Sequence, residues 1–143
     1  MGQQQLLLVI LVTIIVGIAT VVAINTFGSA ADSANLDAVR QDMASIAASA
    51  QGFYMKPDAL AGGGQDFSGM TFDDITFGGD IVSDKIAENS NGSYKLGPGA
   101  SGEISLTAYP SSDPNYVAGS DGTAAADDPI DATIVPDNLN FDS

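Results

Sequence analysis

The chain has 143 residues and a formal net charge of −14, from 18 acidic and 4 basic side chains. Such a surface repels the phosphate backbone of nucleic acids, so we expect no nucleic-acid binding by this chain. Cysteine and histidine are absent, which excludes disulfide bonds, a thiolate nucleophile and metal sites built from Cys or His ligands.

The first element along the chain is an uncharged apolar run at residues 6–24, which reads LLLVILVTIIVGIATVVAI. As a helix this run would be about 28 Å long, close to the roughly 30 Å hydrocarbon core of a bilayer. Signal peptides and ordinary membrane anchors usually carry Lys or Arg on the preceding flank, whereas here the first basic residue is Arg40. Either a basic leader has been removed before residue 1 or the orientation is set in another way, and we expect the first.

A second pattern follows the apolar run. Apolar residues recur there at spacings of three and four, namely Leu36, Val39, Met43, Ile46, Ala50 and Phe53. This spacing is typical of one face of an amphipathic helix, and Pro57 should end it because the residue before a proline avoids the helical conformation. We therefore predict one helix over about residues 3–54, apolar all round in its first half and amphipathic in its second, with Gly28 as a candidate weak point.

This layout resembles that of a type IV pilin or pseudopilin. In that family a prepilin peptidase removes a short basic leader, and the mature chain then has an acidic fifth residue and an unbroken hydrophobic stretch that continues into an amphipathic helix. Residues 1–24 have this layout with Met1 as the mature first residue, except that Gln5 stands where the family has glutamate. The family's glutamate is thought to pair with the amino terminus of an adjacent subunit, and Gln5 offers only a weaker, neutral hydrogen bond. Cleavage after Gly2, which resembles archaeal pilin processing, is the alternative.

The resemblance covers about the first 55 residues and implies a structural role. It implies a subunit of an extracellular type IV pilus-like filament, a homopolymer at the cell surface that is inserted in the cytoplasmic membrane before the pilus machinery assembles it. Two alternatives stay open, a pseudopilin of a secretion or DNA-uptake machine and a single-pass membrane-anchored extracellular binding domain. The residues expected to make the assembly contacts are Met1, Gln5, Leu6, Leu7, Leu8, Val9, Ile10, Ile14, Ile15, Ile18 and Val22.

The expected fold class is α+β, with a long helix at residues 1–55 and a small acidic, β-rich head at residues 56–143. Residues 1–27 form the hydrophobic assembly or transmembrane half of the helix, and Gly62-Gly63-Gly64 is expected to be a flexible turn or linker. An antiparallel sheet of about three to five strands should pack on the second half of the helix and bury its apolar stripe. The expected strands are residues 93–96 and 102–109, joined by a turn at 97–99, with shorter ones at 70–72, 75–77, 79–83, 132–135 and 139–141.

We expect no enzymatic activity and no cofactor. Carboxylates are paired at Asp73-Asp74 and Asp127-Asp128, but both pairs lie in turns that should be exposed, whereas acid–base catalysis needs a partly enclosed pocket. The serines have no histidine partner, and the glycines lack the spacing of a phosphate-binding loop.

Two further hypotheses concern the head. The segment 111–131 reads as a long surface loop whose aspartates offer the hard oxygen ligands that calcium prefers, although their spacing is not that of an EF-hand. The candidate calcium ligands are Asp121, Asp127, Asp128 and Asp131, and the alternative is a solvated acidic loop. In addition, Asn91-Gly92-Ser93 matches the N-glycosylation motif, with Asn91 as the acceptor.

Overall fold

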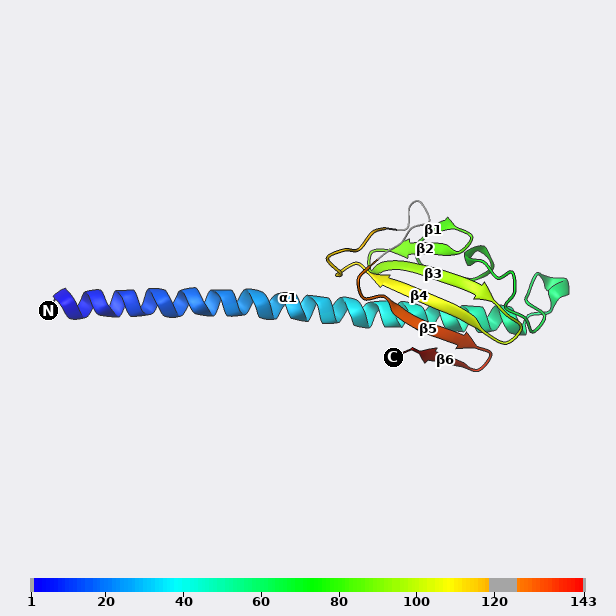
Figure 1. The fold of residues 1–143 in the computed structure, drawn as a ribbon, viewed down its shortest axis with the longest axis horizontal. Coiled ribbons are helices and arrows are strands. Elements are labelled where there is room, and N and C mark those ends of the chain that lie inside the picture. Colours follow the sequence, from blue (N-terminus) through cyan, green and yellow to red (C-terminus); the bar gives the residue numbers. More distant parts are fainter. Residues whose placement is uncertain (1, 119–125, 143) are drawn as a thin grey trace. The chain divides into compact units, whose positions relative to one another are not determined.

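The computed structural model describes residues 2–118 and 126–142. It consists of one long helix, two short 3-10 turns and a six-stranded antiparallel sheet, so the predicted α+β class is confirmed (Figure 1). The elements are α1 (Gly2–Met55), η1 (Asp58–Leu60), η2 (Phe72–Asp74), β1 (Asp80–Ser83), β2 (Ile86–Asn89), β3 (Gly92–Gly99), β4 (Ile104–Pro110), β5 (Ile130–Val135) and β6 (Asn138–Phe141).

Contacts within the chain divide it into two compact units, residues 1–34 and residues 35–143, and the division falls inside α1. Sequence analysis placed the boundary at the end of the helix, at residue 55. Helix residues 35–55 group with the sheet because their apolar stripe packs into the core that the sheet covers. The second half of the helix is thus part of the head.

The helix and the sheet share one hydrophobic core within residues 35–143. The predicted stripe is buried as expected, since Val39, Met43 and Ile46 are fully buried and Phe53 packs against the core while partly exposed. The strands contribute alternate residues, as in a sheet that is covered on one face. The buried strand residues of this face are Ala87, Tyr94, Leu96, Ile104, Leu106, Ala108, Ala132 and Ile134.

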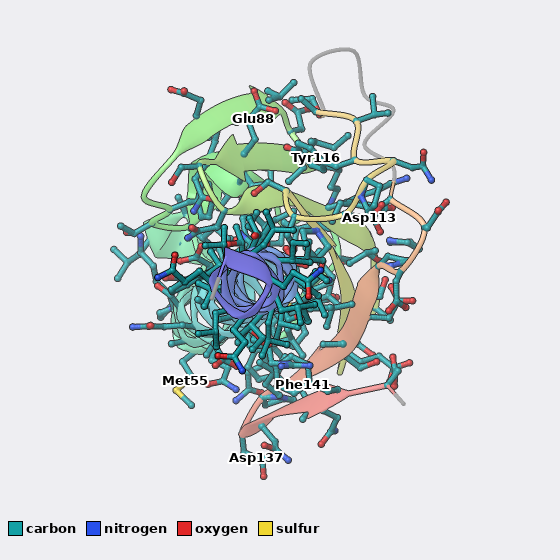
Figure 2. The ribbon with its side chains drawn as sticks, turned by 90° about the vertical axis from the view of Figure 1, so that its left-hand side faces the viewer. Met55, Glu88, Asp113, Tyr116, Asp137 and Phe141 are labelled. Atoms are coloured by element: carbon teal, nitrogen blue, oxygen red, sulfur yellow. The ribbon has the colours of Figure 1, made fainter. Side chains whose placement is uncertain are left out.

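Each strand pairs with its neighbour in sequence, in the order β1 to β6, and all pairs are antiparallel. Figure 2 shows the sheet curving, with Glu88 of β2 towards one edge and Phe141 of β6 at the other. The sheet has more strands than the three to five expected. The additional strand is β2, whose sequence, IAEN, is too short and too polar to show a clear alternation.

The hairpin between β3 and β4 is confirmed, but its turn lies later than predicted. β3 continues through Gly97-Pro98-Gly99, and the chain turns at residues 100–103, where the Ala100 nitrogen donates to the Glu103 carbonyl at 2.8 Å. The two glycines allow close approach, because a Cβ on Gly97 would lie 2.0 Å from Ser105 Oγ and one on Gly99 would lie 2.1 Å from the Phe67 carbonyl oxygen. They serve packing in an irregular part of the strand and not the turn itself.

The strands predicted at residues 70–72 and 75–77 are wrong. This stretch forms the 3-10 turn η2, which the Asp74 carboxylate stabilises by accepting from the Thr71 nitrogen and hydroxyl, each at 2.9 Å. Met70, Phe72 and Ile75 are buried all the same. Their apolar character reflects a loop that covers the core, which a strand pattern cannot distinguish from a short buried strand.

The three consecutive glycines, expected to be a flexible turn or linker, lie in a hydrogen-bonded turn that caps the helix. The chain turns back after Met55, so that the Gly63 nitrogen donates to the Phe53 carbonyl at 2.7 Å and the Gln65 nitrogen to the Tyr54 carbonyl at 2.8 Å. These bonds satisfy carbonyls that the end of a helix leaves without partners. A Cβ on Gly62 would lie 2.2 Å from the Lys56 carbonyl oxygen, so the position requires glycine. The helix itself ends before Pro57, as predicted.

Candidate functional site

The apolar segment of α1, residues 6–24, lies in unit 1–34, and its large side chains are exposed along its whole length. The exposed fraction of the candidate assembly residues from Leu6 to Val22 ranges from 47% at Ile10 to 67% at Val9. Gln5 lies in the same exposed helix, and Met1 lies outside the described residues. In the part of the chain that the structure describes, α1 is the one helix long and apolar enough to cross a membrane by length and composition.

The apolar surface of this segment runs all the way around the helix. Successive residues of an α-helix are about 100° apart, so the uninterrupted run Leu6-Leu7-Leu8-Val9 already places apolar side chains on every side. A helix that is apolar all round suits a lipid bilayer or the centre of a helix bundle and does not suit water. The surface is therefore matched to apolar surroundings in all directions.

The polar side chains of the segment bond within the helix. The Thr13 hydroxyl donates to the Val9 carbonyl, and the Thr20 hydroxyl donates to the Val16 carbonyl at 2.8 Å. Bonds of this kind satisfy a hydroxyl without a partner from outside the helix. The segment can thus enter a dry environment without leaving these hydroxyls unsatisfied, a condition that apolar surroundings impose on every polar group.

Side chains of the segment also form a shallow hollow, lined by Leu8, Val9, Val12, Thr13 and Val16. The lining is almost wholly apolar, and its residues come from successive turns along one side of the helix. Ridges of one helix pack into hollows of this kind on another. The hollow is thus an apolar groove on the surface of this helix.

Within unit 35–143, a cluster of polar side chains joins the helix to the sheet. One carboxylate oxygen of Asp42, on α1, accepts hydrogen bonds from Asn89 Nδ2 at 2.8 Å, Asn91 Nδ2 at 2.8 Å and the Tyr94 hydroxyl at 2.7 Å. Burial acts to raise the pKa of Asp42, but hydrogen bonds from Asn91, Asn89 and Tyr94 outweigh it and hold this pKa below its usual value. Burial, followed by the bond to Asp42, raises the pKa of Tyr94.

The sequence pattern does not predict this cluster, because Asp42 lies off the apolar stripe and has the pattern of an ordinary solvated residue. The only signal in the sequence is the density of side-chain hydrogen-bond donors at residues 89–94, which read NSNGSY. Nothing in a sequence pattern says which carboxylate such donors will face. The cluster acts as a polar clamp between α1 and the β2–β3 hairpin.

The predicted glycan acceptor Asn91 is one of these donors and is half-buried. A glycan would be attached to the same Nδ2 atom that donates to Asp42. Glycosylation at Asn91 stays a prediction, and it would replace one of the two Nδ2 protons, so that the remaining proton would have to make the bond to Asp42.

The proposed calcium ligands are not brought together in the described part of the chain. The backbone nitrogens of Asp127 and Asp128 donate to the Asp113 carboxylate at 3.0 and 3.1 Å, whereas the Asp131 carboxylate accepts from the Thr107 hydroxyl at 2.7 Å. Asp121 lies outside the described residues. Among residues 2–118 and 126–142 no group of three or more acidic side chains is arranged to hold a metal ion. Calcium binding stays a prediction.

A long helix whose second half packs on an antiparallel sheet is compatible with a pilin-like fold. No protein-family model, curated protein or solved structure matches the chain.

Proposed function

We propose that this protein is a structural subunit of an extracellular type IV pilus-like filament, in which the apolar segments of successive copies pack against one another. The observation that supports this best is the exposed, uncharged surface that surrounds α1 over residues 6–24. The same helix continues into residues 35–55, which hold the core of an acidic head. An apolar assembly segment and a soluble head are thereby joined in one element.

The proposed mechanism transfers the apolar segment from the membrane into the filament. The first charged residue of the chain is Asp32, so neither environment would need to accommodate a charge within residues 6–24. Lipid tails are as apolar as leucine, so assembly within the membrane would depend on close side-chain packing and not on removal from water.

Once the filament has left the membrane, the free-energy cost of exposing its apolar segments to water would hold it together. Each large aliphatic side chain contributes about 1.5–3 kcal/mol when it is removed from water, so releasing a whole segment would cost on the order of tens of kcal/mol. Such contacts are not screened by ions. The filament should therefore resist both dilution and salt.

Two other functions would use the same helix. A pseudopilin of a secretion or DNA-uptake machine would form short, sparse assemblies, and a membrane-anchored extracellular binding domain would leave its helix in the bilayer. The second alternative is favoured by the length of the apolar segment, which matches a bilayer. Filament abundance separates the pilin from the pseudopilin, and recovery without detergent separates both from the anchor.

The deciding experiment is electron microscopy of material sheared from producing cells, together with mass spectrometry of the intact subunit. We expect thin filaments built of this chain, beginning at Met1 or Gln3 and N-methylated at that residue. Recovery of the protein only from detergent-solubilised membranes, with no filaments, would overturn the proposal in favour of the anchored domain or a low-copy pseudopilin.

A further inference from the structure

The turn between β2 and β3 contains Asn91-Gly92, the only Asn-Gly step in the sequence. Asparagine is thermally labile, and a following glycine, which has no Cβ, leaves its backbone nitrogen room to approach the asparagine side chain. In the reaction the Gly92 nitrogen loses its proton and bonds to Asn91 Cγ, the Cγ–Nδ2 bond breaks, and ammonia leaves with a proton. Water then opens the succinimide ring to give aspartate or isoaspartate.

The structure holds both reacting groups of this step in other hydrogen bonds. Asn91 Nδ2, the leaving nitrogen, donates to the Asp42 carboxylate at 2.8 Å. The Gly92 nitrogen, the attacking atom, donates to Asn89 Oδ1 at 3.2 Å. Attack would require the Gly92 nitrogen to abandon this acceptor and turn towards the side chain of the preceding residue.

The backbone around the step is fixed as well. The Asn91 carbonyl accepts from Asn35 Nδ2 at 3.0 Å and from the Ser111 nitrogen at 2.8 Å. Gly92 is buried and fits so closely that a Cβ would lie 2.2 Å from the Tyr109 carbonyl oxygen. Rotation about the Cα–C bond of Asn91, which the attack requires, therefore needs the turn to separate from both the helix and β4.

We propose that Asn91 is a conformation-gated deamidation site, which Asp42 keeps unreactive while α1 is docked on the sheet and which reacts when the helix releases the β2–β3 turn. Two of the bonds that hold the turn have their partner on the helix, since Asp42 accepts from Asn91 Nδ2 and Asn35 Nδ2 donates to the Asn91 carbonyl. The inference does not depend on whether the protein forms filaments.

The product would make the release permanent. Deamidation replaces a hydrogen-bond donor with a carboxylate that faces the Asp42 carboxylate across the helix–sheet contact. Two carboxylates at this separation repel each other, and one of them must take up a proton before the contact can close. Isoaspartate would also lengthen the backbone at the start of β3 and disturb its pairing with β2 and β4. A head that has opened would thus retain aspartate or isoaspartate at position 91.

The test follows deamidation at Asn91 in the full-length protein in detergent micelles, incubated at mildly alkaline pH and analysed by peptide mass spectrometry. Asp42→Ala removes the acceptor, and Tyr94→Phe is the matched control, because it removes another donor to the same carboxylate but leaves the Asn91 bond. We expect Asp42→Ala to react about tenfold faster than the wild type, the factor that corresponds to one charge-assisted hydrogen bond, and Tyr94→Phe to stay near the wild-type rate.

Wild-type protein in concentrated urea provides the open reference and covers the case in which Asp42→Ala does not fold. Its Asn91 should react far faster than that of the native protein. Equal rates in native buffer and in urea would overturn the gating, and a folded Asp42→Ala protein that reacts at the wild-type rate would overturn the role of Asp42. A glycan found on Asn91 would also overturn the proposal, since Nδ2 would then already be substituted.

Discussion

Asp42 lies on α1 beside the buried Met43, and its carboxylate receives three side-chain donors from the sheet. Hydrogen bonds to a charged acceptor are stronger than neutral ones, and removing the charge leaves the buried Tyr94 and the half-buried Asn89 and Asn91 with a poorer partner. At the scale of single residues, this carboxylate thus joins the helix to the sheet through three charge-assisted hydrogen bonds.

Asp42→Asn should therefore lower the free energy of unfolding of the head by about 1.5–3 kcal/mol, as expected for hydrogen bonds to a charged group. Urea unfolding in detergent, followed by circular dichroism, measures the change. The control is Asp37→Asn, five residues earlier on the same helix. Asp37 is 81% exposed and pairs only at 3.6 Å with Arg40, so its replacement should change stability by less than about 0.5 kcal/mol. Equal effects of the two substitutions would contradict the clamp.

The lowered pKa of Asp42 also predicts a pH dependence with a definite sign. A carboxylate whose pKa is lower in the folded protein stabilises it fully above the unfolded pKa, near 3.8. This contribution is lost as the pH falls below 3.8 and through the folded pKa. The difference in unfolding free energy between wild type and Asp42→Asn should thus be constant from neutral pH to about pH 5 and shrink below it. A difference that grows on acidification would contradict the assignment.

At the scale of elements, α1 carries two surfaces with different requirements, an exposed apolar one at residues 6–24 and a buried stripe at residues 35–55. A charge in the first should prevent assembly without unfolding the head, because the apolar surroundings offer it no partner. Insertion scales put an aspartate at the centre of a bilayer at about 2.5–3.5 kcal/mol.

Ile15→Asp should accordingly abolish filaments, as judged by electron microscopy of sheared material and by fractionation of the cells. Ile81→Asp is the matched control, since Ile81 is 44% exposed but lies on β1 of the head. It should leave filaments intact. Normal filaments from Ile15→Asp would contradict the proposed packing of the apolar segments.

The sequence predicted elements well where one physical cause dominates. The 3–4 spacing predicted the buried stripe, Pro57 predicted the end of the helix, and strict alternation predicted the β3–β4 hairpin. Prediction failed where residues serve tertiary contacts. Gly97 and Gly99 allow other segments of the same chain to approach closely, and Phe72 is buried in a 3-10 turn. The apolar surface of the candidate site was predicted directly, because exposure there follows from composition. The Asp42 clamp was not, because it joins residues about fifty positions apart.

At the scale of the whole molecule, charge is divided very unevenly between the two units. Residues 1–34 contain a single charged side chain, Asp32, which leaves −13 of the formal net charge of −14 to residues 35–143. Closely spaced copies of such a head repel one another, and salt screens that repulsion. The apolar contacts of residues 6–24 are not weakened by salt in the same way.

Filaments should therefore become more resistant to dissociation as sodium chloride rises from about 0.1 to 1 M, where the screening length falls from about 10 to about 3 Å. Sedimentation of sheared filaments, with the fraction of soluble subunit measured at each salt concentration, tests this. Sucrose at matched osmolality is the control for solvent effects other than screening. Filaments that fall apart in high salt would instead indicate heads held together by ion pairs.

The order of the strands has a consequence for how the head reaches its native state. Because β1 to β6 pair strictly with their sequence neighbours, four of the five hairpins close over two to four residues, and only the connection between β4 and β5, residues 111–129, is long. Topologies rich in local contacts fold faster than those that depend on distant pairings. The buried stripe of α1 precedes all six strands in the sequence. Each hairpin can thus add to a surface that already exists when it emerges, so that the head can be completed in the order in which the chain is made.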